Sequence, residues 1–330
     1  MKKVVVLGIE STAHTFGVGI ASSTGEILAN ENHTYVPKTG GIHPREAAEH
    51  HSKVAASLVK SALEKSGLKL KEIDGVAVAL GPGMGPCLRV GATVARALSL
   101  ASRKPLIGVN HAVAHLEIAR LSTGFDDPLF IYVAGGNTMI TTFSEGKYRV
   151  FGETLDIPLG NCLDTFAREV GLGHPGVPEV EKLASKGKHY HILPYTVKGQ
   201  DMSYSGLLTA ALRLYREGVP LEDVCLSLVE NAYSMLTEVA ERALAHTRKT
   251  QLVITGGVAR SRLLCKKLEL MATSRGVDFR PVKPEYAGDN GAMIAYTGAL
   301  ALASKVITPL EESAIKPLWR LDEVEIPWRT

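Results

Sequence analysis

The sequence is poor in cysteine and has no long apolar run. Its four cysteines stand far apart and form no C-x-x-C pair. This spacing argues against a disulfide framework or a thiolate zinc site and predicts reduced thiols in a cytoplasmic protein. The first apolar run, residues 4–9, is too short for a signal sequence and meets Glu10 at once, so we predict a strand. No run reaches membrane-spanning length. The cysteines are Cys87, Cys162, Cys225 and Cys265.

The chain also lacks a strong excess of either charge. It has 37 Lys and Arg against 34 Asp and Glu, a net charge of +3. This balance does not by itself indicate a nucleic-acid binder, although it does not exclude one. With 45% hydrophobic and 22% charged residues, the composition is that of a soluble globular protein. Its 330 residues are enough for two domains.

Three common nucleotide-binding or catalytic motifs are missing as well. No G-x-x-x-x-G-K-[ST] occurs, which excludes P-loop chemistry. Residues 81–86 are glycine-rich but end in Pro86 and lack the G-x-G-x-x-G spacing, so we predict a structural turn there. Ala112 follows His111, so the glutamate of the H-E-x-x-H proteases is absent.

The pattern that is present indicates an α/β fold with an internal duplication. Three strands open the chain, and helices then alternate with two more strands, which is the order of an actin-like (ribonuclease-H-like) domain. A generic mixed α/β sheet is the alternative. After a turn-rich break at 123–128, the strand–polar turn–strand opening recurs. We expect one domain at 1–126, completed by a last helix and tail at 292–330, and a second domain with helical insertions at 127–291.

The expected elements follow from periodicity and from Gly and Pro positions. The last helix is expected to pack back on the first domain, and the tail from 307 to 330 to lie extended on the surface. Strands are predicted at 4–9, 16–22, 26–34, 74–80, 105–109, 129–134, 139–143, 148–154, 251–255 and 277–280. Helices are predicted at 44–66, 87–102, from 111, 162–170, 178–186, 205–217, 221–247, 258–274 and 291–304.

Two histidines form the first candidate site. His111 and His115 stand four apart in a helical segment, so both imidazoles lie on one face, one turn apart. Such a pair can bind a metal from one side, although chance spacing gives the same pattern. Asp289, at a Gly-flanked helix start, and Tyr132, on the first strand of the second domain, are further candidate ligands. A helix-capping aspartate and a core tyrosine are the alternatives.

Small polar turns form a second kind of candidate site. Ser11 and Thr12 in the first domain, and the turn at 135–138 with Asn137 in the second, could offer backbone N–H groups to phosphates. Ordinary hairpins are the alternative. Gly256-Gly257 allows a ligand to approach a helix start, or makes a tight turn. Basic clusters at 43–51 and 260–267 are predicted as solvated helix faces that could also meet a partner or nucleic acid.

Several motifs together resemble the TsaD/KEOPS catalytic-subunit family in its archaeal form. The resemblance covers about residues 4 to 320. The motifs are GIESTA at 8–13, GGIHPREA at 40–47, GPG at 81–83, NHAVAH at 110–115, YVAGGNT at 132–138 and GDN at 288–290.

The resemblance implies an ASKHA (actin/Hsp70/sugar-kinase-like) fold. The implied activity is transfer of threonylcarbamoyl from threonylcarbamoyl-AMP to the exocyclic amine of the adenosine next to the anticodon, in tRNAs that read ANN codons. It also implies one divalent metal, Fe²⁺ with Zn²⁺ as the alternative, and threonylcarbamoyl-AMP or ATP as nucleotide ligand. Its metal ligands match His111, His115, Tyr132 and Asp289. Its substrate contacts match Tyr132, Val133, Ala134, Gly135, Gly136, Asp164, Val177, Glu181, Ser261 and Asp289.

Two positions depart from the family pattern. Val177 stands where the family usually has Gly, and Ser261 where it usually has Asn. We expect Asp164 and Glu181 to accept hydrogen bonds from ribose hydroxyls, and no residue stands out as general base. The implied partners are tRNA, a small kinase-like KEOPS subunit and two accessory proteins, with a separate synthase supplying the adenylate. A metallopeptidase, an ATP-dependent small-molecule kinase and an ATP-binding scaffold are the alternative functions.

Overall fold

The computed structural model describes residues 3–37, 41–173 and 175–329. Gly40, part of one motif above, therefore lies outside the described residues, as do residues 38–39. The chain forms two compact units. Unit 1 comprises Met1–Ser122, Ser144–Tyr148 and Asp289–Thr330, and unit 2 comprises Thr123–Phe143 and Arg149–Gly288. Each unit is built around one five-stranded sheet.

The sheet of unit 1 has the strand order β3-β2-β1-β4-β5. The first three strands form an antiparallel meander, and β4 and β5 run parallel to β1. The crossovers between the parallel strands are helices, as parallel pairing requires. The strands are β1 (Val5–Glu10), β2 (Thr15–Ser22), β3 (Ile27–Thr34), β4 (Gly75–Gly81) and β5 (Leu106–Asn110).

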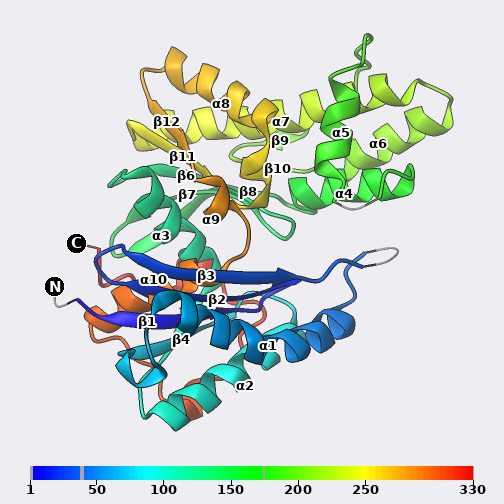
Figure 1. The fold of residues 1–330 in the computed structure, drawn as a ribbon. Coiled ribbons are helices and arrows are strands. Elements are labelled where there is room, and N and C mark those ends of the chain that lie inside the picture. The colour runs from blue at the N-terminus through cyan, green and yellow to red at the C-terminus, as the bar shows by residue number, and fades with distance from the viewer. Residues whose placement is uncertain (1–2, 38–40, 174, 330) are drawn as a thin grey trace. The chain divides into compact units, whose positions relative to one another are not determined.

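Helices cover both faces of this sheet because the strands are apolar on both sides. On β1, Leu7 and Ile9 join the core under α1 (Pro44–Ser66) and α2 (Gly85–Ser102). The intervening Gly8 faces α10 (Gly291–Ala303), and a Cβ there would lie 2.1 Å from the backbone nitrogen of Ala295. Glycine thus lets the last helix pack directly on the first strand, as predicted (Figure 1). The fourth helix, α3 (His111–Thr123), follows β5.

Unit 2 repeats this arrangement. Its sheet order β12-β11-β6-β7-β8 corresponds strand for strand to unit 1, with β7 antiparallel to β6 and β11 and β12 parallel. Its strands are β6 (Leu129–Val133), β7 (Thr138–Ser144), β8 (Lys147–Glu153), β11 (Gln251–Thr255) and β12 (Asp278–Pro281). Its helices are α4 (Leu159–Glu169), α5 (Val177–Ala184), α6 (Ser205–Arg216), α7 (Leu221–Thr247), α8 (Arg262–Ser274) and α9 (Pro284–Ala287).

The structure differs from the sequence prediction in a few places. The single helix expected at 258–274 is a 3-10 turn, Gly257–Arg260, followed by α8, because the Ser261 hydroxyl accepts from Leu264 N at 3.0 Å and caps a new helix. The two-residue strands β9 (Val197–Lys198) and β10 (Asp201–Met202) and helix α9 were not predicted. The tail from 307 is not merely surface-lying, since Ser313, Leu321 and Ile326 are buried. No helix within the described residues is long and apolar enough to cross a membrane.

Candidate functional site

The two histidines begin the helix α3, and Asn110 fixes where that helix starts. The Asn110 side-chain oxygen accepts from the backbone N–H groups of Ala112 at 3.0 Å and Val113 at 3.2 Å. Its amide nitrogen donates to the backbone carbonyls of Trp319 and Arg320 at 3.2 and 3.4 Å. One buried side chain therefore caps the helix and ties its first turn to the C-terminal tail.

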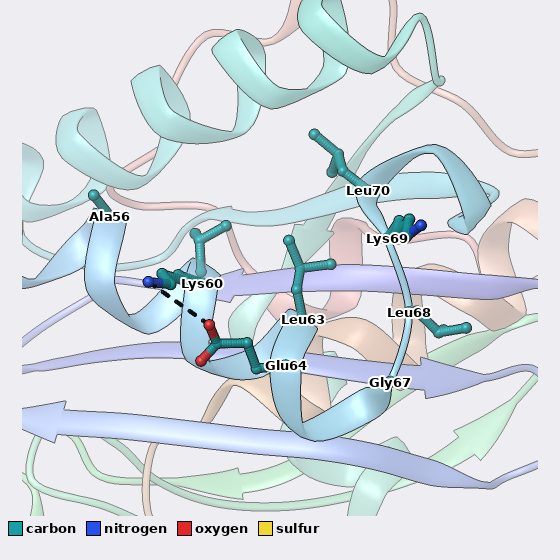
Figure 2. A pocket seen from close by; sticks show the side chains of 9 residues that line it. Ala56, Lys60, Leu63, Glu64, Gly67, Leu68, Lys69 and Leu70 are labelled. Atoms are coloured by element: carbon teal, nitrogen blue, oxygen red, sulfur yellow. Dashed lines mark ion pairs between the residues drawn. The ribbon is translucent and has the colours of Figure 1, made fainter.

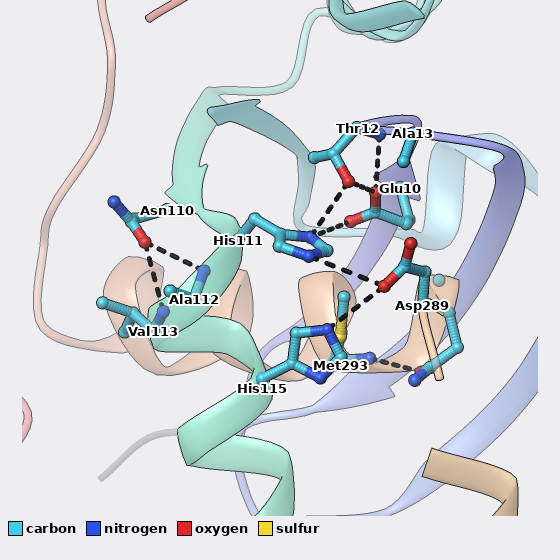
Figure 3. A network of polar contacts seen from close by, with 12 residues as sticks. Glu10, Thr12, Ala13, Asn110, His111, Ala112, Val113, His115, Asp289 and Met293 are labelled. Atoms are coloured by element: carbon cyan, nitrogen blue, oxygen red, sulfur yellow. Dashed lines mark hydrogen bonds and ion pairs between the residues drawn. The ribbon is translucent and has the colours of Figure 1, made fainter. Parts of the chain in front are cut away.

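His111, His115 and Asp289 converge in unit 1, as Figure 3 shows. The Nε2 atoms of His111 and His115 lie 3.6 and 3.3 Å from Asp289 Oδ1. The two rings meet edge to face, with centroids 4.7 Å apart. Among the residues that the structure describes, these three form the cluster of ligand-type side chains whose donor atoms all lie within 4.8 Å of one another.

A fourth group, the Glu10 carboxylate, orients His111. His111 Nδ1 donates to Glu10 Oε2 at 2.8 Å, and the N–H and hydroxyl of Thr12 donate to Glu10 Oε1 at 2.6 and 2.5 Å. Because Nδ1 is turned toward Glu10, the other ring nitrogen, Nε2, faces Asp289. This is the arrangement in which a carboxylate supports a metal-binding imidazole.

Burial and the neighbouring carboxylates act in opposite directions on the two histidines of this cluster. Burial lowers the pKa of His111, but the carboxylates of Glu10 and Asp289 outweigh it and raise that pKa to about 9. Burial lowers the pKa of His115 despite its contact with Asp289. Although burial opposes it, the two histidines hold the pKa of Asp289 below its ordinary range. Two imidazole nitrogens and one ionised carboxylate oxygen are a donor set that fits a divalent cation.

Asp289 belongs to unit 1, with both histidines, whereas the sequence places it near the end of the second domain. The physical reason is the adjacent helix. Asn290 Oδ1 accepts from Met293 N at 3.0 Å and so caps α10, which packs on β1 and β2 of unit 1. Asp289 directly precedes this cap, so it lies in unit 1 with the start of α10. The role of helix cap therefore falls to Asn290, and Asp289 faces the histidines.

Tyr132 belongs to unit 2, where it is fully buried near the end of β6. The turn that follows is exposed at Gly135 and Gly136, and it is closed by a hydrogen bond from Ala134 N to the carbonyl of Asn137 at 2.8 Å. A Cβ added at either glycine would meet open space. The turn thus presents bare backbone to solvent, the property expected of a site that a ligand approaches closely.

The first glycine of the pair after β11, Gly256, is needed by the fold itself. Gly256 has φ +94°, and a Cβ there would lie 2.2 Å from the carbonyl oxygen of Val133. A glycine is therefore required at this position, where the chain makes a tight turn against β6. At Gly257 nothing lies within 4 Å of an added Cβ, so that position is open.

The remaining predicted contacts of unit 2 form two connected pairs. Asp164 Oδ1 accepts from Gly176 N at 2.7 Å and from Val177 N at 3.3 Å, so the aspartate engages the backbone of Val177 rather than its side chain. Glu181 Oε1 accepts short hydrogen bonds from the hydroxyls of Ser261 and Tyr233. The Ser261 hydroxyl therefore both caps α8 and holds Glu181 in place.

Two residues in these clusters were not assigned a role from the sequence. Glu10 lies inside a recognised motif, and its signal is a carboxylate at the end of an otherwise apolar strand, which needs a buried partner. Tyr233 lies within the long helix α7 and carries no such signal. Of the predicted phosphate turn in unit 1, Thr12 is engaged by Glu10, and Ser11 Oγ is buried with no hydrogen-bond partner among the described residues.

A groove of about 600 Å³ lies beside the end of α1 in unit 1 (Figure 2). It is lined mainly by aliphatic side chains, among them Val59, Leu63 and Leu68, with Lys60 and Glu64 paired at 3.7 Å. It contains none of the predicted site residues. The groove is therefore separate from the histidine cluster.

Comparison with solved structures places the fold among ASKHA proteins. HypF of T. kodakarensis superposes with a TM-score of 0.66 at 16% identity, over 92% of this chain and 48% of that one. Component A of the Acidaminococcus fermentans (R)-2-hydroxyglutaryl-CoA dehydratase gives a TM-score of 0.56 at 15% identity, over 91% and 99% of the two chains. At such identities the likeness concerns the fold alone, and it confirms the predicted α/β ASKHA architecture.

The family follows from closer relatives. The TsaD family model, described as tRNA N6-adenosine threonylcarbamoyltransferase, matches residues 26–296. A protein of that name from Thermofilum pendens is 72% identical over 331 residues, 100% of this chain and 98% of its own. Another from Caldivirga maquilingensis is 58% identical over 327 residues, 99% and 98% of the two chains. The chain belongs to the TsaD family, and the resemblance read from its motifs is confirmed.

Proposed function

We propose that this chain is a tRNA N6-adenosine threonylcarbamoyltransferase. It transfers the threonylcarbamoyl group of threonylcarbamoyl-AMP to the exocyclic amine of the adenosine next to the anticodon, in tRNAs that read ANN codons, and releases AMP. The observation that carries this proposal is family membership along the full chain, at 72% identity to a relative of that name. The converging His111, His115 and Asp289 side chains support it with a site of suitable chemistry.

We propose that His111, His115 and Asp289 bind one divalent metal, with Tyr132 as a fourth ligand. Two imidazoles with one carboxylate, and no thiolate, suit Fe²⁺ and Zn²⁺ alike. We propose Fe²⁺ because the family resemblance implies it, with Zn²⁺ as the alternative. When bound, the metal supplies a Lewis acid for the carbamoyl and threonyl end of the adenylate. The role of Glu10 is to keep the proton on His111 Nδ1 so that Nε2 remains a donor of its lone pair.

The nucleotide part of the substrate is assigned to unit 2. We propose that Asp164 and Glu181 accept hydrogen bonds from the ribose, with Ser261 and Tyr233 holding Glu181 in place. The turn from Ala134 to Asn137, exposed at Gly135 and Gly136, is proposed to meet the phosphate, and Tyr132 and Val133 to border it. Ser11 and Thr12 stay part of this proposal, although a phosphate contact from the Thr12 N–H would require its bond to Glu10 to break.

The proposal also covers the compartment, the partner proteins and the domains of the enzyme. We propose that the enzyme works in the cytoplasm within a KEOPS assembly, with a small kinase or ATPase subunit and accessory proteins, and that a separate synthase supplies the acyl-adenylate. The four free cysteines support a reducing compartment. The two units are proposed to be the duplicated domains expected from the sequence at 1–126 with 292–330 and at 127–291, although residues 144–148 and 289–291 belong to unit 1 and residues 123–126 to unit 2. Because the net charge is only +3, tRNA binding should draw on partner surfaces too.

The test supplies threonylcarbamoyl-AMP and unmodified tRNA, with and without the partner subunits, and measures the modified nucleoside and the metal content. His111→Ala should lose both bound metal and product. His246→Ala, a matched change at an exposed histidine of α7, should retain both. Full activity with normal metal content in His111→Ala would refute the site. Peptide cleavage or acceptor-dependent ADP formation that disappears in His111→Ala would instead favour the peptidase or the kinase. Robust turnover by the complex carrying His111→Ala would favour the scaffold.

A further inference from the structure

Between α5 and β9 runs a segment without helix or strand, residues 187–196, called here the strap. Side chains of α7 hold its backbone in place. Asp223 Oδ1 accepts from the N–H groups of Lys188 at 2.6 Å and His189 at 3.0 Å, and Ser227 Oγ accepts from His191 N at 2.8 Å. These anchors sit four residues apart on one face of α7. The strap is therefore a fixed part of unit 2.

The anchoring extends to two tyrosine hydroxyls. Asn231 Nδ2 donates to the Tyr190 hydroxyl at 2.8 Å, and the Tyr195 hydroxyl donates to Glu238 Oε2 at 2.5 Å. The helix from Asp223 to Glu238 spans roughly 22 Å, at about 1.5 Å per residue. The strap from Lys188 to Tyr195 spans roughly 23 Å if extended, at about 3.3 Å per residue. The matching lengths mean that the strap lies extended along α7.

The tyrosine rings remain exposed although their hydroxyls are fixed. Tyr190 is 52% exposed and Tyr195 46%, and the intervening Ile192 is 91% exposed. A ring that is held at its polar end has already lost much of its rotational freedom, so binding against its face costs little further entropy. Exposed rings and an exposed isoleucine on an anchored strap are what a binding surface requires.

The charged side chains of the strap's own stretch have one sign. Residues 182–198 include no aspartate and no glutamate, but two histidines. The carboxylates of α7 that face the strap, Asp223 and Glu238, accept from its N–H groups and from the Tyr195 hydroxyl. The lysines supply the positive charge that attracts a phosphate backbone. Lysines beside aromatic faces are the combination that single-stranded nucleic acid recognition uses, with bases stacked on the rings. The same stretch contains four lysines: Lys182, Lys186, Lys188 and Lys198.

We infer that the strap binds a single-stranded loop of the RNA substrate, with bases stacked on Tyr190 and Tyr195 and phosphates near Lys186 and Lys188. This inference rests on the proposed function, because it takes a tRNA as the substrate. It adds a surface in unit 2 that lies apart in sequence from the histidine cluster. Duplex RNA would engage the lysines but not the rings, because its bases are already stacked.

The first experiment measures RNA binding by the full chain. The probes are an unmodified anticodon stem-loop RNA and a closed duplex RNA of equal length. The double variant Tyr190→Ala and Tyr195→Ala should bind the stem-loop at least about 30-fold more weakly, since two stacking faces are lost, and the duplex equally well. Tyr215→Ala, at an exposed tyrosine of α6, is the matched control and should change neither affinity.

The second experiment measures the salt dependence of stem-loop binding. Lys186→Gln with Lys188→Gln should reduce the slope of log K against log salt by about 1.4, for two single-strand phosphates. Lys53→Gln with Lys71→Gln, at exposed lysines of unit 1, should leave it unchanged. Thermal melting of each variant checks that the chain is folded. No stem-loop binding by the wild type, or tyrosine and lysine variants that bind like the wild type, would overturn the inference and leave a protein partner as the strap's occupant.

Steady-state turnover separates this inference from the proposed function. If both hold, the tyrosine variant raises the KM for tRNA at least about 30-fold, while the affinity for threonylcarbamoyl-AMP is unchanged. If threonylcarbamoyl transfer fails in the wild type but stem-loop binding still depends on the strap, the proposed function is wrong and the RNA surface stands. Transfer with an unaltered KM for tRNA in the tyrosine variant would refute the strap alone.

Discussion

Replacing Glu10 by glutamine tests how the histidine cluster is held. Glu10 is fully buried and accepts three hydrogen bonds, from His111 Nδ1 at 2.8 Å and from the N–H and hydroxyl of Thr12 at 2.6 and 2.5 Å. Glutamine has the same size but carries an NH₂ group in place of one acceptor oxygen. If its oxygen stays with Thr12, its NH₂ faces His111 Nδ1. Two donors cannot share that contact, so the His111 proton must move to Nε2.

The consequence is a loss of metal affinity, because a protonated Nε2 has no lone pair to offer. Groups that orient a metal-binding histidine typically contribute about 10- to 100-fold in affinity, or about 1.4 to 2.8 kcal/mol. We expect a loss of this size for Glu10→Gln. The assay is competition with a chromophoric chelator for Zn²⁺ and, without oxygen, for Fe²⁺, with the number of bound ions measured by mass spectrometry.

Glu117→Gln is the matched control. Glu117 is also fully buried and lies on α3, but it accepts from Tyr148 at 2.7 Å and from Arg120 at 3.1 Å rather than from a cluster histidine. This change should lower the free energy of unfolding without changing metal affinity. Unchanged affinity in Glu10→Gln, or an equal loss in both variants, would refute the reasoning.

Three further predictions concern stability. Burial raises the pKa of Asp156, but hydrogen bonds from Ser203 and Ser205 outweigh it and lower that pKa. The ionised carboxylate therefore stabilises the fold above its unfolded pKa of about 3.9, and this stabilisation is lost as the pH falls below that value. In urea titrations, the difference in free energy of unfolding between the wild type and Asp156→Asn should therefore be smaller at pH 3 than at pH 6. An equal difference at both pH values would contradict this. Asn110→Ala should cost about 1 kcal/mol for the lost helix cap, and more if the tail is released, measured as urea midpoints. Ser261→Ala should cost a similar amount and weaken nucleotide binding, whereas Ser261→Asn, also a capping residue, should keep most of the stability; equal losses would show that capping is not the cause.

Local patterns in the sequence predicted most of the fold. The bounds of α1, α7 and β11 follow from periodicity and from capping or breaking residues, which act over a few positions. The duplication was visible because the strand–turn–strand opening recurs, and the two sheets do have the same strand order. The split before α8 was missed because the hydroxyl of Ser261 ends one helical turn and begins the next, which periodicity does not register.

The candidate site, too, was predicted from the sequence only in its local part. The sequence by itself determined that His111 and His115 share a helix face, because spacing along one helix is a local property. Only the tertiary structure decided which groups meet them. Glu10 is 101 residues from His111 and Asp289 is 174 residues from His115, and both arrive through the packing of α3, α10 and β1. Contacts at such separations depend on how whole elements pack, and no short stretch of sequence encodes that.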